Sequence, residues 1–140
     1  MGEIAVHLEH SLRAVVESAD HQFFADEPLD AGGENAGPGP YDLLLASLGA
    51  CTAMTLRLYA DRKAWPLEGV HVTLRHARQH RRDCEDCTEE PGPYVDRIER
   101  RIRLEGNLEP EQRTRLLEIA ERCPVHRTLT NHPKIDTSLE

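Results

Sequence analysis

Four cysteines are the residues of this chain best suited to chemistry: Cys51, Cys84, Cys87 and Cys123. A cysteine thiolate is both a nucleophile and a metal ligand, so these residues could support redox chemistry or hold a metal. Cys84 and Cys87 are separated by only two residues, whereas Cys51 and Cys123 lie in different parts of the chain. The two pairs therefore call for separate interpretations.

Cys51 lies inside the apolar segment LLLASLGACTAMTL. A free cysteine in such a segment is usually a small buried residue. Two features favour reactivity instead. The residues around Cys51 are small, which leaves room for a molecule to approach the sulfur. A second cysteine, Cys123, directly precedes Pro124 at the end of another predicted apolar helix face. The two thiols can form a disulfide if their Cα atoms come within about 7 Å.

A reactive Cys51 would need a group that stabilises its thiolate. Cys51 lies well inside its predicted helix, and the favourable effect of the helix dipole fades within the first turn. We therefore expect an Arg braced by a carboxylate to supply the stabilising charge. His126 follows Cys123 by three residues and either lies near its sulfur or caps a helix end.

The pair Cys84 and Cys87 has the spacing of a zinc knuckle or of a redox pair. We expect a solvated loop with two free thiols. A metal site completed by His76 and His80 is one alternative, and a redox pair is the other. On a continuous strand the two histidines would stand roughly 13 Å apart, so a single metal requires a bend between them.

The order of the predicted elements indicates a single α+β domain over residues 1–140. Proline and glycine mark a loop at residues 29–40, and Trp65-Pro66 ends the long helix that follows it. The expected elements are extended segments within 4–25, a helix over 40–63, strands over 70–74 and 98–104, a helix over 110–122 and a last strand over 134–138.

Composition excludes some function classes. The net charge is −8, which argues against nucleic-acid binding because that depends on concentrated Lys and Arg. No signal peptide is visible, and the longest apolar stretch, near residues 43–54, is expected to be too short for a membrane span. We therefore expect a cytoplasmic protein without a membrane partner. The long helix is apolar on every side, and a second copy of the chain would help to cover it.

Two segments resemble the signature of the OsmC/Ohr family. PYDLLLASLGACTAMTL is similar to the central helix that carries the peroxidatic Cys of that family. ERCPVHRTL is similar to its second motif, a Cys-Pro pair near the end of the other helix. The order of the motifs, their separation and the flanking strands also match, so the resemblance covers essentially the whole chain.

The resemblance implies an intertwined homodimer in which an antiparallel sheet packs on the central helix. Cys51 would attack an organic hydroperoxide, such as a fatty-acid hydroperoxide, and become a sulfenic acid. Cys123 would resolve it to a disulfide, which a dithiol such as dihydrolipoamide reduces without any cofactor. We expect the substrate to contact Tyr41, Leu48 and Met54.

The sequence departs from the family pattern at the charged pair that serves the Cys. Family members that reduce organic hydroperoxides usually carry a Glu ten residues before the Cys, paired with an N-terminal Arg. Position 41 is Tyr, and the nearest carboxylate is Asp42, one residue later. One residue along a helix turns a side chain by roughly 100° about the helix axis, so Asp42 would point in a different direction from a Glu at position 41. The candidate arginines are Arg13, in the N-terminal region, and Arg100, on the apolar face of a predicted strand.

Two other functions stay open on these residues. The same scaffold could bind an apolar ligand or a thiol partner without turnover, since the usual Glu is replaced by Tyr41. Alternatively, Cys84 and Cys87 could form the centre of a metal-binding module.

Overall fold

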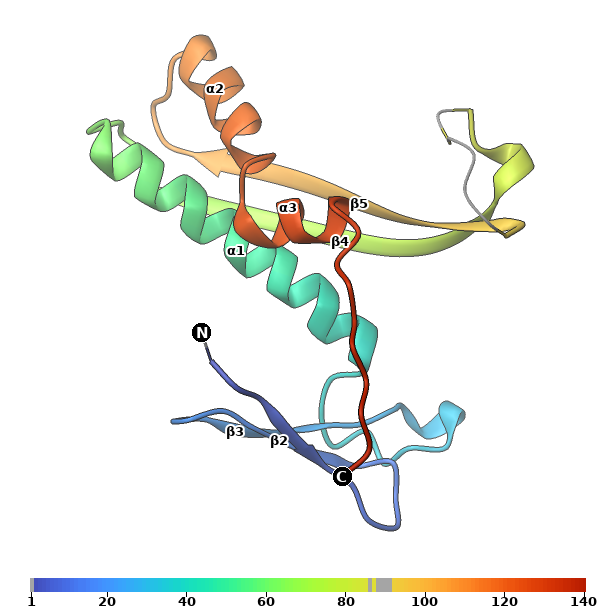
Figure 1. Ribbon diagram of the computed structural model, residues 1–140. Coiled ribbons are helices and arrows are strands. Elements are labelled where there is room, and N and C mark those ends of the chain that lie inside the picture. The colour runs from blue at the N-terminus through green and yellow to red at the C-terminus, as the bar shows by residue number, and fades with distance from the viewer. Residues whose placement is uncertain (1, 86, 88–91) are drawn as a thin grey trace. The chain divides into compact units, whose positions relative to one another are not determined.

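The computed structural model describes residues 2–85, 87 and 92–140 (Figure 1). The chain forms two compact units, Met1–Leu44 and Leu45–Glu140, which we call unit 1 and unit 2. The elements are β1 (Ala5–His7), β2 (Ala14–Glu17), β3 (Gln22–Ala25), η1 (Leu29–Ala31), α1 (Pro40–Arg62), β4 (Gly69–His80), η2 (Arg81–Asp83), β5 (Tyr94–Glu105), α2 (Pro110–Ala120) and α3 (Pro124–Thr130). The α+β class expected from the sequence is confirmed. The prediction of a single domain over residues 1–140 stays a prediction.

Unit 1 is built on a three-stranded antiparallel sheet in the order β1-β2-β3. The central strand pairs Val16 with Val6 on one side and with Phe23 on the other. Val16 is buried, as is Ala25 at the end of β3. The loop that follows β3 ends at Pro40, which opens α1 because its missing N–H is not needed in a first helical turn.

Unit 2 contains the long antiparallel hairpin β4-β5, whose register pairs Gly69 with Glu105 at one end and His80 with Tyr94 at the other. Its apolar core gathers side chains from α1, α2 and the segments that flank the hairpin. The fully buried members include Leu56 and Ala60 of α1 and Leu116 of α2. Arg113 helps to fix the start of α2 by donating to two carbonyl oxygens of the preceding segment.

Helix α1 is buried along one face only. Its buried residues, Leu48, Gly49, Thr52, Leu56 and Ala60, follow helical spacing. Gly49 permits a close approach to β4, since a Cβ at that position would lie 2.8 Å from Leu74 Cδ1. The expectation of a helix buried on every side is therefore not met within one chain.

By length and composition α1 could cross a membrane, contrary to the expectation from the shorter apolar stretch. The central helix of a soluble protein passes the same test, so the property is weak evidence.

Two other expectations about elements are wrong. Pro124 does not simply end a helix; it is the first residue of α3, a helix that the sequence reading missed. The stretch 134–138 forms no strand, because it pairs with no strand among the described residues.

Candidate active site

The structure brings the two free cysteines, Cys51 and Cys123, into contact within unit 2. Cys51 lies half-buried on α1, and Cys123 is fully buried between α2 and α3. The Cys51 side chain lies close enough to Cys123 to lower the pKa of the Cys123 thiol. Residues far apart in sequence thus form one pair of neighbouring thiols, of which Cys51 is the more accessible.

Cys123 holds its position because its sulfur caps α3. Its backbone is extended, and Sγ accepts a hydrogen bond from the backbone N–H of His126 at 3.3 Å. A helix leaves its first N–H groups without partners inside the helix, and a side-chain acceptor at this position supplies one. Pro124 follows at a position where its missing N–H has no cost. The Cys-Pro sequence therefore begins a helix and places the cysteine sulfur where it can accept from backbone N–H groups of the first turn.

Hydrogen bonds to this sulfur favour its thiolate. Burial alone raises the pKa of the Cys123 thiol, because a charged group loses solvation. The opposing hydrogen bonds come from the backbone N–H of His126, the thiol of Cys51, the hydroxyl of Thr52 and the backbone N–H of Val125. Together they outweigh burial, and the pKa of Cys123 lies below its ordinary value.

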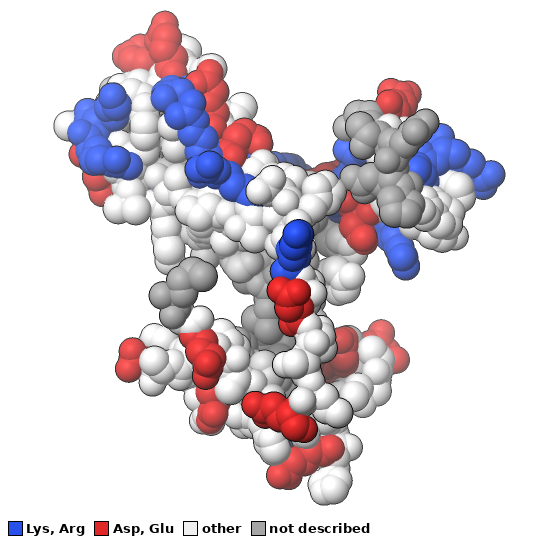
Figure 2. Space-filling model, in the orientation of Figure 1, with Lys and Arg blue, Asp and Glu red and all other residues white. Residues whose placement is uncertain are grey.

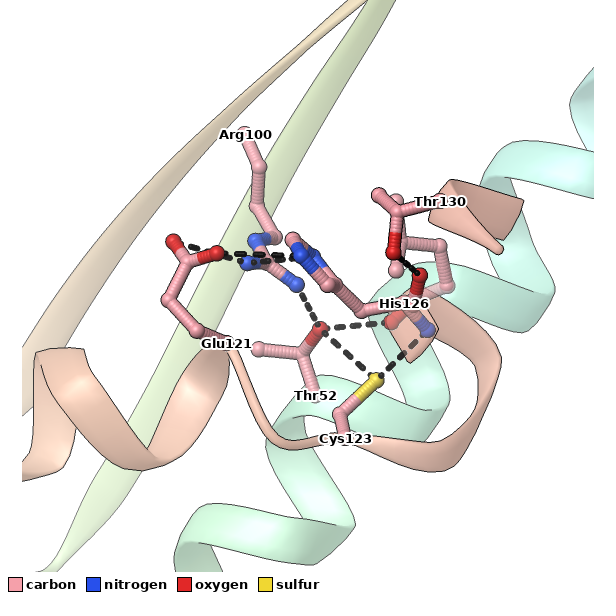
Figure 3. A network of polar contacts seen from close by, with 7 residues as sticks. Thr52, Arg100, Glu121, Cys123, His126 and Thr130 are labelled. Atoms are coloured by element: carbon pink, nitrogen blue, oxygen red, sulfur yellow. Dashed lines mark hydrogen bonds and ion pairs between the residues drawn. The ribbon is translucent and has the colours of Figure 1, made fainter. Parts of the chain in front are cut away.

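Thr52 connects Cys123 to a charged network, which Figure 3 shows. Its Oγ1 lies 3.9 Å from Cys123 Sγ and 2.6 Å from the carbonyl oxygen of Leu48, one helical turn earlier. Thr52 Oγ1 also accepts a hydrogen bond from Arg100 Nη1 at 3.0 Å. A single hydroxyl on α1 therefore links a guanidinium on β5 with the buried sulfur.

Arg100 is in turn held by His126 and Glu121 (Figure 3). Its Nη2 lies 3.1 Å from His126 Nδ1 and 3.6 Å from Glu121 Oε1. His126 Nε2 lies 3.0 Å from the other oxygen of Glu121. Because Arg100 can only donate, these contacts place the imidazole proton on Nε2, which donates to Glu121. The arrangement is an arginine braced by a carboxylate, and its role in stabilising the Cys51 thiolate stays a prediction.

A pocket of about 400 Å³ opens beside this network. Arg100, Glu121 and His126 contribute polar groups to its wall. Apolar side chains from three different elements line the rest, namely Leu48, Ile98 and Leu129. A site with an apolar wall and a few convergent polar groups is typical of small-molecule binding. The side chain of Arg100 is only 10% exposed, so its charge acts in a largely desolvated setting.

The other residues predicted for the site have different surroundings. Leu48 lines the pocket, whereas Met54 is 65% exposed on α1. Arg13, Tyr41 and Asp42 belong to unit 1. The Arg13 guanidinium stacks on the Phe24 ring at 5.1 Å from its centroid, and Asp42 Oδ2 accepts from the N–H of Gly39 before α1. Their roles at Cys51 stay predictions.

Cys84 and Cys87 form a disulfide, so the expectation of two free thiols is wrong. The two cysteines are close enough to bond because η2 turns the chain directly after β4. His76 instead contacts Asp96 at 2.8 Å, and the His80 ring packs edge-on against Tyr94. Among residues 2–85, 87 and 92–140, no three His, Cys, Asp or Glu side chains are grouped to hold a metal ion.

Sequence reasoning missed Thr52 and Glu121 and left the role of His126 open. Thr52 follows Cys51 directly, but its contact depends on the packing of α1 against β5. The available signal was the sequence Glu121-Arg122-Cys123 with His126, which places a carboxylate and an imidazole near one sulfur.

The comparisons with known proteins agree with this fold. The family model described as OsmC-like protein matches residues 32–138. No curated protein sequence matches. An OsmC-like protein from Mycoplasma pneumoniae has a TM-score of 0.75 at 21% identity, covering 94% of this chain and 89% of that one.

Two other solved structures share the fold. The organic hydroperoxide resistance protein OsmC from Legionella pneumophila has a TM-score of 0.66 at 22% identity, covering 92% of this chain and 88% of that one. The organic hydroperoxide resistance protein OhrB of Bacillus subtilis has a TM-score of 0.64 at 17% identity, covering 94% and 92%. At these identities the likeness shows the fold. Because the family model spans most of the sequence, this chain belongs to the OsmC-like protein family.

Proposed function

We propose that this protein is a cysteine-based hydroperoxide reductase that works through Cys51 and Cys123 in the cytoplasm. The observation that carries the proposal is the pair of neighbouring free thiols, which Thr52 connects to Arg100 in the wall of the pocket. Relatives of the same fold are named as organic hydroperoxide resistance proteins, which supports a role in peroxide resistance.

The two sulfurs would divide the task. Cys123 is buried and surrounded by hydrogen-bond donors, so it is the sulfur that best stabilises negative charge. Cys51 is half-buried and is the sulfur that a peroxide can reach. Transfer of a proton from Cys51 to the neighbouring sulfur of Cys123 would leave the thiolate on the accessible sulfur. Cys123 therefore acts first as the base for its neighbour.

The chemical steps balance within the thiol pair and the peroxide. The Cys51 thiolate attacks the terminal oxygen of ROOH, the O–O bond breaks, and the leaving alkoxide takes up a proton to give the alcohol. Cys51 is then a sulfenic acid. The sulfur of Cys123 attacks the sulfenic sulfur, a disulfide forms, and water leaves. Two electrons pass from the thiols to the peroxide, and an external dithiol such as dihydrolipoamide restores both thiols by exchange.

Arg100 would stabilise the charge that develops on the departing oxygen. Its guanidinium is held by Thr52, His126 and Glu121 and lines the pocket. A donor fixed in advance within a poorly solvated site needs little reorganisation during the reaction. The apolar part of the pocket, with Leu48 and Ile98, would take the organic group of the hydroperoxide.

The first test is consumption of tert-butyl hydroperoxide with dihydrolipoamide by the wild type, Cys51→Ser and Cys123→Ser. We expect turnover by the wild type, loss of turnover in Cys51→Ser, and a stable Cys51 sulfenic acid detectable by mass spectrometry in Cys123→Ser. Unchanged peroxide consumption by Cys51→Ser would exclude the proposed nucleophile.

A binding function on the same scaffold is the second candidate, and the apolar lining of the pocket favours it. In that case the wild type would leave the peroxide unreacted while its two thiols stay intact. An apolar ligand would then bind in the pocket, and Leu48→Arg would abolish this binding.

A further inference from the structure

We propose that Cys84 and Cys87 form a second redox site, which small thiols reduce with Cys84 as the departing sulfur. This site is independent of Cys51 and Cys123 and does not rest on the function proposed for them. It takes thiols as its substrate class, and its chemistry is thiol–disulfide exchange.

The disulfide lies beside the end of the β4-β5 hairpin where His80 pairs with Tyr94. The turn is held by the backbone N–H of Arg81, which donates to the Pro93 carbonyl at 2.7 Å. The side chain of Arg81 donates through Nε to the Gly92 carbonyl at 3.0 Å. Cys84 and Cys87 are both only half-buried, so a small thiol can reach the bond.

Arg97 distinguishes the two sulfurs. Its Nη2 donates to Cys84 Sγ at 3.1 Å, and its Nε donates to Gln79 Oε1 at 3.2 Å. Gln79 is itself fixed, because its Nε2 donates to the Asp83 carbonyl at 2.8 Å. A guanidinium therefore lies in position against one sulfur of the bond. A hydrogen bond between a cation and a thiolate is about twice as strong as one between neutral groups.

Among the residues that the structure describes near the tip, other charged groups have different contacts. Arg78 lies over the Tyr94 ring at 5.2 Å from its centroid. Asp96 contacts His76, and Asp83 and Glu85 are exposed. These exposed carboxylates are screened by solvent, whereas the contact from Arg97 is direct and part-buried.

The exchange follows from this asymmetry. The thiolate of an external thiol attacks Cys87 Sγ, the S–S bond breaks, and Cys84 leaves as a thiolate that Arg97 stabilises. A second external thiolate attacks the sulfur of the first external thiol in the mixed disulfide. That S–S bond breaks, and Cys87 is released as a thiol. The net reaction oxidises two external thiols to their disulfide and reduces Cys84 and Cys87 to thiols. A thiol that is stabilised as its thiolate leaves faster and makes the disulfide easier to reduce.

The test is the redox equilibrium of Cys84 and Cys87 in the full wild-type chain, set by glutathione buffers and read by alkylation and peptide mass mapping. Mapping keeps this pair separate from Cys51 and Cys123, so the result does not depend on peroxide turnover. We expect Arg97→Gln to shift the equilibrium toward the disulfide by roughly ten- to a hundred-fold, since it removes a hydrogen bond to a charged sulfur. In the reduced wild type, Cys84 should alkylate at lower pH than Cys87.

Arg78→Gln is the matched control. It removes the same charge from the same hairpin, but Arg78 contacts the Tyr94 ring rather than the sulfur. We expect its equilibrium to stay within about two-fold of the wild type, because only a screened interaction is lost. Equal shifts in Arg97→Gln and Arg78→Gln would overturn the assignment of Arg97. A disulfide that stays oxidised in fully reducing glutathione, or a reduced pair that binds zinc instead of reoxidising, would overturn the redox site itself.

Discussion

The hydroxyl of Thr52 connects three groups of the candidate site. It lies between the Leu48 carbonyl, Arg100 Nη1 and Cys123 Sγ. Thr52 is fully buried, so water cannot replace any of these contacts readily. The position and the charge of the buried sulfur therefore depend on one side chain that is not itself ionisable.

Removing this hydroxyl tests its effect on the sulfur. We expect Thr52→Val to raise the pKa of Cys123, because the sulfur loses a neighbouring hydroxyl that favours its thiolate while burial still opposes the charge. The alkylation rate of Cys123 near neutral pH should fall roughly two- to ten-fold. The measurement is the pH dependence of iodoacetamide labelling followed by peptide mapping. Thr55→Val on the same helix is the control, and an equal loss in both variants would contradict the role of Thr52.

At the level of elements, the sequence predicted the long helix α1 and the strands β4 and β5 better than it predicted helix α3 and the packing that brings the two cysteines together. Proline and glycine signals placed α1 within one residue of its observed end, and alternation located β4 and β5. Helix α3 was missed because Pro124 signals both a helix end and a helix start. The contact between Cys51 and Cys123 was a hypothesis that no local pattern could establish, since it depends on how α1, α2 and α3 pack.

The start of α3 provides a prediction about stability. Cys123 Sγ accepts from the N–H of His126, so a replacement with an oxygen acceptor keeps the cap and an alanine removes it. We expect Cys123→Ala to be less stable than Cys123→Ser by about 1 kcal/mol. Urea unfolding of both variants under reducing conditions measures the difference. Equal stabilities would mean that the sulfur does not cap the helix.

The loop between β3 and α1 depends on a buried carboxylate, Asp26. Burial by itself raises the pKa of Asp26, but backbone N–H groups of Ala36, Glu27 and Glu34 donate to it, and Arg13 adds a favourable charge. The net pKa of Asp26 lies below its ordinary value of 3.8. The loop folds closely around this group, since a Cβ on Gly33 would lie 2.7 Å from Asp26 Oδ1.

This carboxylate predicts the acid sensitivity of unit 1. A carboxyl whose pKa is depressed by folding contributes stability above its unfolded pKa, and the contribution is lost as the pH falls through the folded value. We therefore expect the free energy of unfolding to fall from about pH 4 downward. Asp26→Asn should be less stable at neutral pH and should show a weaker acid dependence. Urea unfolding between pH 2.5 and pH 6 measures both effects, with Asp30→Asn in the same loop as control. An unchanged acid dependence in Asp26→Asn would refute the assignment.

At the scale of the whole molecule, the charge and the apolar surface are unevenly divided. Residues 1–44 contain nine Asp and Glu and a single Arg, so the excess negative charge of the chain lies in unit 1. Figure 2 shows acidic side chains over the part of the molecule that contains the strands of unit 1, and mixed charges on the part that contains α2. Large apolar side chains are also exposed on α1, where Met54 is 65% and Leu58 is 62% exposed. A single chain leaves this helix incompletely covered.

A second copy of the chain is the partner that we propose for this exposed face, since large apolar side chains of the central helix are exposed on a single chain. We expect light scattering to give twice the mass of one chain. Leu58→Glu should shift the protein toward monomer or aggregates, because burying an unpaired carboxylate in an apolar interface costs several kcal/mol. Leu117→Glu on α2 is the matched control, since Leu117 is 60% exposed. A wild type that stays monomeric at micromolar concentration would contradict the dimer, and Leu117→Glu alone causing dissociation would place the interface on α2 instead of α1.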